Sequence, residues 1–280
     1  MNALVTGAVQ VINKVDSKAA RLLGSSGQTT VVVSPGKNHM TMAMDSTKAP
    51  FTDNNVRLAL KHAIDREHVL SLAFAGYGTI GNDHPVPKSD PFHHSELPQR
   101  SYDPEKAKWY LSEAGLDNLA VELFTSSAAG VQAVDTAQVF AESVKKVDEL
   151  DLSVNRAPSD GYWSNTWMKE LFFMSYWTAR ATADMMLIYA YTSTAKYNES
   201  RFASAKLDQI LDTARSEPDF EKRKRLYWDA QELLNQSGSS IVYAFADCID
   251  AHGPAVGGFV PDGARETGGG RAIERLWLKG

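Results

Sequence analysis

Residues 160–194 read DGYWSNTWMKELFFMSYWTARATADMMLIYAYTST and contain three of the six tryptophans of the chain. Within this stretch, residues 171–177 form a largely apolar run, which is typical of a strand that is buried on both faces. Thr182 follows at a position where its hydroxyl can accept a hydrogen bond from the first turn of a helix that begins near Asp184. The stretch therefore predicts a buried strand, a short connection and a helix.

Arg180 lies in this predicted connection, between the end of the strand and the start of the helix. In open α/β sheets, ligands collect at the carboxyl ends of strands, where loops converge and helix amino termini present unpaired N–H groups. A fixed cation in such a place is suited to anchoring a negative group. Arg180 is therefore the first candidate for a binding residue.

Outside this stretch, helical and strand patterns alternate along most of the chain. Asp103-Pro104-Glu105 is the strongest helix start, because the Asp can cap and the Pro stands where its missing N–H does no harm. The spacing predicts strands at residues 29–34, 39–44, 120–124, 152–156 and 240–246, and helices at 17–23, 53–63, 67–76, 103–115, 131–147, 204–214 and 219–235. Such alternation indicates an α/β fold with a largely parallel or mixed sheet flanked by helices.

Two segments show no such period. Residues 78–97 are rich in Pro and His and are predicted to be a loop. The pair His93-His94 suggests a metal site, but no carboxylate or third imidazole stands at ligand spacing. Residues 251–270 are rich in Gly without a phosphate-binding motif between a strand and a helix, and they are also predicted to be a loop. We expect no metal site and no cofactor.

Charge and cysteine content exclude several classes of protein. The net charge of −5 argues against a nucleic-acid binder, which normally presents a basic surface, and the basic run at residues 221–225 falls on the polar face of a predicted helix. Cys248 is the only cysteine, so an internal disulfide and a cysteine-based zinc site are excluded. We expect Cys248 to be a small buried residue at the end of a strand.

The common hydrolase and nucleotide-binding motifs are absent, and no run reaches the roughly 18 apolar residues that a membrane-spanning helix requires. Carboxylates such as Asp160, Glu170 and Asp184 could approach one another, but nothing in the sequence distinguishes them from solvated surface acids. The sequence therefore indicates a globular protein that is not an enzyme.

The order of these signals resembles a known family. The stretches that carry the resemblance are MNALVTGAVQVINKV (1–15), STKAPFTDNNVRLALKHAIDREHVL (46–70) with AGYGTIGNDHPVP (75–87), YDPEKAKWYLSEAGL (102–116), the tryptophan-rich stretch, and FASAKLDQILDTARSEPDFEKRKRLYWDAQELL (202–234) with SIVYAFA (240–246). Together they resemble the dipeptide and oligopeptide solute-binding proteins of ABC transporters, family 5. The resemblance spans nearly the whole chain.

The resemblance implies a periplasmic-binding-protein-like fold of type II, of which this sequence is the carboxyl-terminal part. Residues 1–38 would be the end of a first lobe, residues 39–246 the second lobe, and residues 247–280 a segment that returns to the first lobe. It further implies a peptide or small-molecule ligand between two lobes, an ABC permease in the inner membrane as partner, and a periplasmic location. The export signal and the first part of the protein would precede this sequence. We expect a monomer.

The resemblance also suggests which residues contact the ligand. In dipeptide and oligopeptide binders, the residue three positions beyond the Trp that ends this strand is typically an Asp that pairs with the α-amino group of the peptide. Here Arg180 stands three positions beyond Trp177, which suits a carboxylate or phosphate instead. The expected ligand contacts are Arg180, with apolar or stacking surface from Trp177, Trp163, Tyr162 and Trp167.

Other interpretations remain open at this point. Arg180 could pair with Asp160 or Asp184 inside the lobe, and the tryptophans could belong to the core. The domain could also be a non-catalytic interaction or sensing module of the same fold, with no transported ligand. An enzyme of this architecture is a third possibility, and it would require carboxylates or a Ser-His pair that converge in a cleft.

Overall fold

The computed structural model describes residues 1–25 and 27–279 and is built around one mixed sheet of seven strands. The two longest strands, β2 (Thr30–Met44) and β7 (Ser240–His252), pair antiparallel along most of their length. The other members are β1 (Val11–Ile12), β3 (Gly78–Ile80), β4 (Leu119–Thr125), β5 (Leu150–Arg156) and β6 (Phe172–Trp177). The strand order is β1-β7-β2-β6-β4-β5, with β3 also on β7.

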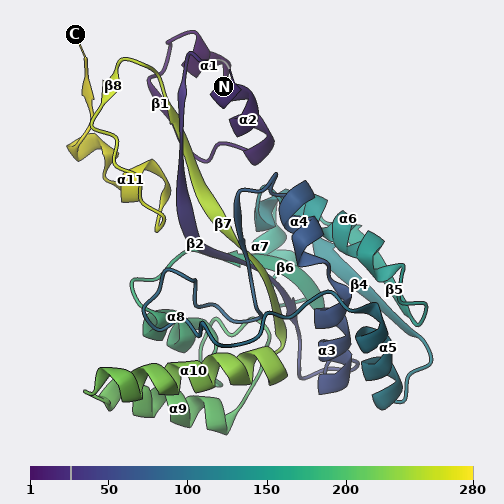
Figure 1. The fold of residues 1–280 in the computed structure, drawn as a ribbon. Coiled ribbons are helices and arrows are strands. Elements are labelled where there is room, and N and C mark those ends of the chain that lie inside the picture. The colour runs from purple at the N-terminus through teal and green to yellow at the C-terminus, as the bar shows by residue number, and fades with distance from the viewer. Residues whose placement is uncertain (26, 280) are drawn as a thin grey trace.

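Helices cover both faces of this sheet (Figure 1). Four of them, α3 (Asn54–Ala63), α4 (Arg66–Leu72), α5 (Pro104–Glu113) and α6 (Ala133–Val144), pack on one face around the largest hydrophobic core. On the other face, α8 (Ala183–Ala190), α9 (Ala205–Ser216) and α10 (Phe220–Ser237) form a second core. The expected α/β fold, a mixed sheet flanked by helices, is confirmed.

Side chains of β2 at residues 39–44 point alternately to the two faces of the sheet and are buried on both. Met40, Met42 and Met44 point into the large core, whereas His39 and Thr41 are buried on the opposite face. Because both faces of the strand are covered, the residues that alternate with the methionines are buried as well, polar or not.

Several of the predicted helices begin at a residue whose side chain caps the first turn. Asp53, Asp103 and Asp219 each accept a hydrogen bond from a backbone N–H in the first turn of α3, α5 and α10, and Ser204 does the same for α9. Each cap satisfies a donor that the helix itself leaves unpaired.

Several predicted boundaries were wrong, including the end of the helix predicted at residues 67–76, which stops at Leu72 as α4. Thr30–Met44 is one continuous strand, where two were predicted at residues 29–34 and 39–44, because Pro35 and Gly36 fall where the β2–β7 register shifts. A Cβ on Gly36 would lie 1.6 Å from the carbonyl oxygen of Ala246, so only glycine permits this approach. The predicted loop at 78–97 begins with β3, which pairs with β7. Strand β7 itself continues to His252.

The glycine-rich tail also contains short elements. They are β8 (Val256–Gly257), α11 (Glu266–Gly270) and β9 (Trp277–Leu278), with a 3-10 turn at Ala272–Glu274. Strands β8 and β9 pair with each other in a separate two-stranded sheet. The loop prediction for residues 251–270 was therefore only partly right.

The two ends of the chain lie together, away from the helices of the main layers (Figure 1). Helices α1 (Asn2–Val5) and α2 (Ser17–Ser25) contribute Leu4, Ala20 and Leu23 to a third, smaller core that also contains Ile249 and Ala251 of β7. Strands β2 and β7 thus run from this small group of elements into the main body. No helix formed by residues 1–25 or 27–279 is long and apolar enough to cross a membrane.

Candidate functional site

The junction between β6 and α8 is held in place from both sides. Trp177, the last residue of β6, lies opposite His39 of β2 in the antiparallel register. The next turn is tied to β2 because the backbone N–H of Ala179 donates to Oδ1 of Asn38 at 2.8 Å. Thr182 then caps α8, as predicted, and accepts from the N–H of Met185 at 3.2 Å. The structure therefore fixes the loop that carries Arg180.

Arg180 makes only local contacts. Its Nη1 donates to the carbonyl oxygen of Thr178 at 2.9 Å and to the Thr178 hydroxyl at 3.0 Å, and its guanidinium lies over the Tyr189 ring. Within residues 1–25 and 27–279 it forms no ion pair. Asp184, one of the two carboxylates considered as its partner, instead accepts from the Tyr227 hydroxyl and lies 3.9 Å from Nε of Arg215. Arg180 therefore keeps donors for another group.

A shallow depression lies beside Arg180, at the side of α8 that faces β2. Its lining includes Lys37, Pro85, Asp90, Arg180 and Met186. Two of these residues are basic and one is acidic, so the charged side chains that line the depression sum to a net positive charge.

Five aromatic residues form a continuous surface next to this loop, and we refer to them as the aromatic surface: Trp163, Trp167, Tyr176, Tyr189 and Tyr197. Tyr189 stacks on Tyr197 with ring centroids 4.7 Å apart, and Tyr197 stacks on Trp167 at 6.3 Å. Trp163 meets Trp167 at 6.0 Å and Tyr176 at 5.8 Å, edge to face in both cases. Trp163, Tyr176 and Tyr189 are 42%, 37% and 39% exposed, so together they present neighbouring aromatic rings to solvent.

Two of the predicted contact residues are buried behind this surface. Tyr162 is 1% exposed, and its hydroxyl donates to the carbonyl oxygen of Met174 at 2.7 Å. Burial raises the pKa of Tyr162. Trp177 is 8% exposed and stacks on His39. The structure thus brings Trp163, Trp167, Trp177 and Arg180 together around the end of β6, with Tyr162 in the layer beneath Trp163.

Glu199 is a residue that the sequence did not single out. It is 4% exposed, and its two carboxylate oxygens accept from the indole N–H groups of Trp167 at 2.7 Å and Trp177 at 3.1 Å. Burial raises the pKa of Glu199 above its ordinary value, although the hydrogen bonds from the two indoles and Ser175 act in the opposite direction. No sequence signal identified it, because an acid in a polar loop normally lies in solvent.

His39 is uncharged in this setting. Burial lowers its pKa to about 3, with smaller contributions from His84 and Arg180, and its Nε2 is hydrogen-bonded to the Tyr191 hydroxyl at 2.9 Å. His39 therefore adds no positive charge near Arg180.

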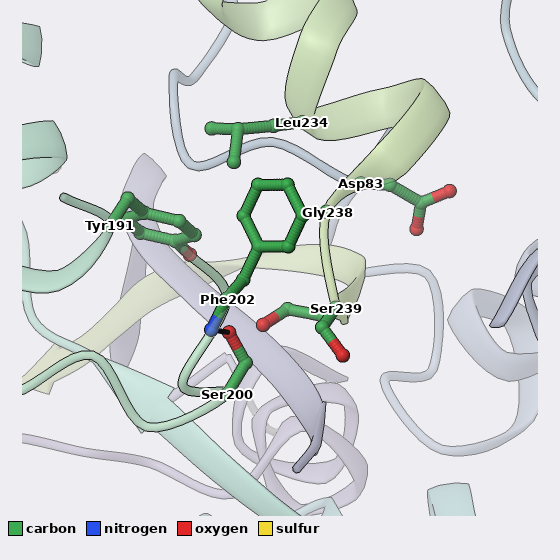
Figure 2. A pocket seen from close by; sticks show the side chains of 8 residues that line it. Asp83, Tyr191, Ser200, Phe202, Leu234, Gly238 and Ser239 are labelled. Carbon is green, nitrogen blue, oxygen red and sulfur yellow. Dashed lines mark hydrogen bonds between the residues drawn. The ribbon is translucent and has the colours of Figure 1, made fainter. Parts of the chain in front are cut away.

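The internal cavity drawn in Figure 2 is not a solute site. It is lined by residues that include Asp83, Tyr191, Phe202 and Ser239, and its volume of about 10 Å³ suits one water molecule. In Figure 2 the Asp83 carboxylate points away from the Phe202 ring. That carboxylate is bound instead by Arg66 at 2.7 Å and by Arg100 at 2.9 Å.

The histidines of the predicted loop do not assemble into a metal centre. The rings of His84 and His93 lie 5.5 Å apart, and His94 stacks on Trp228. Among the residues that the structure describes, no group of three or more His, Cys, Asp or Glu side chains is placed to hold a metal ion.

The fold has counterparts among known proteins. The structure superposes on the periplasmic binding protein DppA from Helicobacter pylori in complex with the peptide STSA, with a TM-score of 0.88 and 21% identity, over 100% of this chain and 54% of that chain. The oligopeptide-binding protein AppA from Bacillus subtilis, in complex with a nonapeptide, gives a TM-score of 0.84 with 19% identity, over 100% of this chain and 58% of that chain. These likenesses establish the fold.

Sequence comparison leads to the same group. The glutathione-binding protein GsiB of Salmonella typhimurium (strain LT2) is 27% identical over 271 residues, which cover 92% of this chain and 52% of GsiB. GsiB of Pectobacterium atrosepticum is 28% identical with the same coverage. The chain therefore spans about half the length of the curated relatives that it matches.

A family model decides the assignment. The model described as "Bacterial extracellular solute-binding proteins, family 5 Middle" matches residues 1–199, well over half of the chain. Members of this family bind solutes for ABC transporters and do not catalyse reactions. The chain belongs to the bacterial extracellular solute-binding proteins of family 5.

Proposed function

We propose that this chain supplies one lobe and the connecting strands of an extracytoplasmic solute-binding protein, which encloses its solute between two lobes and delivers it to an ABC permease. The second lobe would comprise residues 39–246, and residues 1–38 and 247–280 would belong to the first. The separation of the small core around Leu4 and Ile249 from the two large cores supports this division.

The solute would lie against the aromatic surface and present a negative group to Arg180. The observation that carries this proposal is the pairing of a guanidinium that has no carboxylate partner in the described chain with exposed stacking surface beside it. A planar cation and aromatic rings together suit an organic anion with an apolar part. Tyr162 would support Trp163 from below rather than contact the solute.

The relatives suggest which compounds to test. GsiB is a glutathione-binding protein, DppA and AppA were solved with peptides, and AgaA of A. tumefaciens was solved with agropinic acid. Glutathione, short peptides and agropinic acid all carry a carboxylate, whose charge is opposite to that of Arg180.

Two measurements test the proposal. Native mass spectrometry of the complete protein from its own host would show a co-purifying organic anion, and a thermal-shift screen with glutathione and short peptides would show stabilisation by mass action. The proposal fails if neither a bound compound nor a stabilising anion is found, and especially if every stabilising compound is a cation.

A lobe on its own should bind weakly. A two-lobed clamp gains affinity by enclosing its solute from both sides, so the 280-residue chain offers only part of the contact area. Calorimetry on this chain should therefore give no more than weak binding, and a submicromolar Kd would contradict the two-lobe arrangement.

A further inference from the structure

One carboxylate joins the two tryptophans that underlie the aromatic surface. Glu199 Oε2 accepts from Trp167, which follows helix α7 (Tyr162–Asn165), and Oε1 accepts from Trp177, the last residue of β6. The two indoles belong to different elements and are linked to each other through the same side chain. Each oxygen has its own donor, so both rings are fixed in rotation as well as in position.

Burial of the Glu199 carboxylate costs free energy, which a residue that only packed in the interior would not require. Glu199 is almost fully buried, and within the described chain it has no Lys, Arg or His partner. A buried carboxylate that is stabilised only by neutral donors loses much of its hydration, and a hydrophobic residue of similar size would avoid that loss. What the carboxylate supplies and a hydrophobic residue could not is an acceptor for each of the two indole N–H groups.

The loops that carry Trp167 and Glu199 are also tied together. Nη2 of Arg201 donates to the carbonyl oxygen of Met168 at 3.0 Å, and Nε of Arg201 lies 3.3 Å from Oδ2 of Asp45. Met168 and Arg201 both have left-handed backbone angles, with φ of 57° and 53°. Non-glycine residues keep such angles when the surrounding structure holds them there, and they concentrate at ligand-binding sites.

Rotation of either indole would change the exposed surface. Trp167 contacts Trp163 and Tyr197, and Trp177 meets Tyr189 edge to face at 5.9 Å. Tyr189 in turn lies beneath the Arg180 guanidinium. The two buried hydrogen bonds are thus connected by ring contacts to the exposed rings and to the cation.

We propose that Glu199 is a positioning residue that sets the shape of the aromatic surface, and through it the selectivity for solutes with a flat apolar group. The second part rests on the function proposed above. Substitution by Gln is the sharpest probe, because an amide keeps one acceptor oxygen and turns an N–H₂ donor toward the other indole N–H.

Fluorine NMR of the chain labelled with 5-fluorotryptophan tests the positioning directly, with the six resonances assigned by single Trp→Phe variants. In Glu199→Gln, we expect the Trp167 and Trp177 resonances to shift and broaden while that of Trp228, whose N–H donates to the carbonyl of His93, stays in place. The matched control is Glu170→Gln. Glu170 is a half-buried acid three residues beyond Trp167, and its substitution should leave all six resonances unchanged. Unmoved Trp167 and Trp177 resonances in Glu199→Gln would overturn the proposal.

A second variant covers the case in which Glu199→Gln does not fold. Trp167→Phe removes one donor and leaves the carboxylate, so the Trp177 resonance should shift through the shared acceptor. If it keeps its wild-type position, the two indoles are not coupled through Glu199 and the proposal is wrong.

Selectivity is tested with two probes: N-acetyl-L-tryptophan, which has a carboxylate and an aromatic ring, and N-acetylglycine, which has the carboxylate alone. Each is titrated at millimolar concentrations, and binding is followed by the shift of the Trp163 resonance. Glu199→Gln should weaken binding of the aromatic probe about fivefold or more and leave the weaker glycine probe unchanged. Equal weakening of both probes would contradict the selectivity role. If neither probe shifts the Trp163 resonance in the wild type, the selectivity part of the proposal is wrong, whereas the positioning role is still decided by the resonances of Trp167 and Trp177.

Discussion

The guanidinium carbon of Arg180 lies 4.6 Å from the centroid of the Tyr189 ring, while Nη1 is held by the carbonyl and hydroxyl of Thr178. The planar cation is thus oriented by a ring on one face and by Thr178 at one end. Its remaining donors are available to a planar anion such as a carboxylate, and no carboxylate among the described residues occupies them.

Replacement of Arg180 by Ala should therefore weaken binding of an anionic solute by the complete protein. Hydrogen bonds to charged groups contribute about 1.5–3 kcal/mol, which corresponds to a rise in Kd of roughly 10- to 100-fold. Arg180→Lys should recover only part of the affinity, because an ammonium lacks the bidentate geometry. Calorimetry with the co-purified compound measures this, with Arg225→Ala on the exposed side of α10 as control. An unchanged Kd in Arg180→Ala would exclude Arg180 as the anchor.

Tyr162 and Trp163 are adjacent in sequence but should respond to substitution in opposite ways. Tyr162→Phe removes the buried hydrogen bond to Met174 and should lower the free energy of unfolding by about 1 kcal/mol, with little change in solute affinity. Trp163→Ala removes a side chain that is 42% exposed, and it should weaken binding with little loss of stability. Urea unfolding and calorimetry on both variants separate the effects. The reverse result would place Tyr162, and not Trp163, against the solute.

Local signals explain why much of the fold was predictable. The caps at Asp103 and Thr182 are short-range hydrogen bonds that depend on residue type and spacing, and each forms where predicted. The strand predicted from the apolar run at residues 171–177 appears as β6 (Phe172–Trp177), which is buried except at Tyr176.

The errors come from long-range contacts. Pro35 and Gly36 ordinarily interrupt a strand, but here a shift in pairing with β7 accommodates both of them. The exposure of Trp163 and the burial of Tyr162 depend on how α7 lies on β4 and β6, which periodicity in a four-residue helix does not determine. The burial of Glu199 could not be predicted from local sequence, because its partners Trp167 and Trp177 lie 32 and 22 residues away.

Cys248 should be unreactive in the folded chain. It is 2% exposed, and burial, with smaller contributions from neighbouring carboxylates, raises the pKa of its thiol to about 12. Since the thiolate is the reactive form, a disulfide reagent at pH 8 should label the native chain far more slowly than the urea-unfolded chain, which should give one thiol. Rapid labelling without denaturant would show that the contact between Cys248 and Gly263 opens readily.

Lys61 gives the stability of the chain an unusual dependence on pH. Its ammonium is fully buried and donates to the carbonyl oxygens of Leu234 and Asn235 at 3.1 and 3.0 Å, and burial lowers its pKa from 10.5 to about 7. Between those pH values the unfolded chain binds one proton more than the folded chain, so the free energy of unfolding should rise with pH. From pH 7.5 to 9.5 the rise attributable to Lys61 should be about 1–3 kcal/mol.

Substitution of Lys61 by Met isolates this contribution, since Met retains the length of the side chain but does not titrate. Urea unfolding at several pH values should show a smaller slope for Lys61→Met than for the wild type, even though the variant leaves two carbonyls without their donor. Lys145→Met, at an exposed position where the lysine pairs with Glu142, should keep the wild-type slope. Parallel slopes for Lys61→Met and the wild type would mean that Lys61 is charged in the folded chain throughout this range, and that the carbonyls of Leu234 and Asn235 stabilise the ammonium enough to offset its burial.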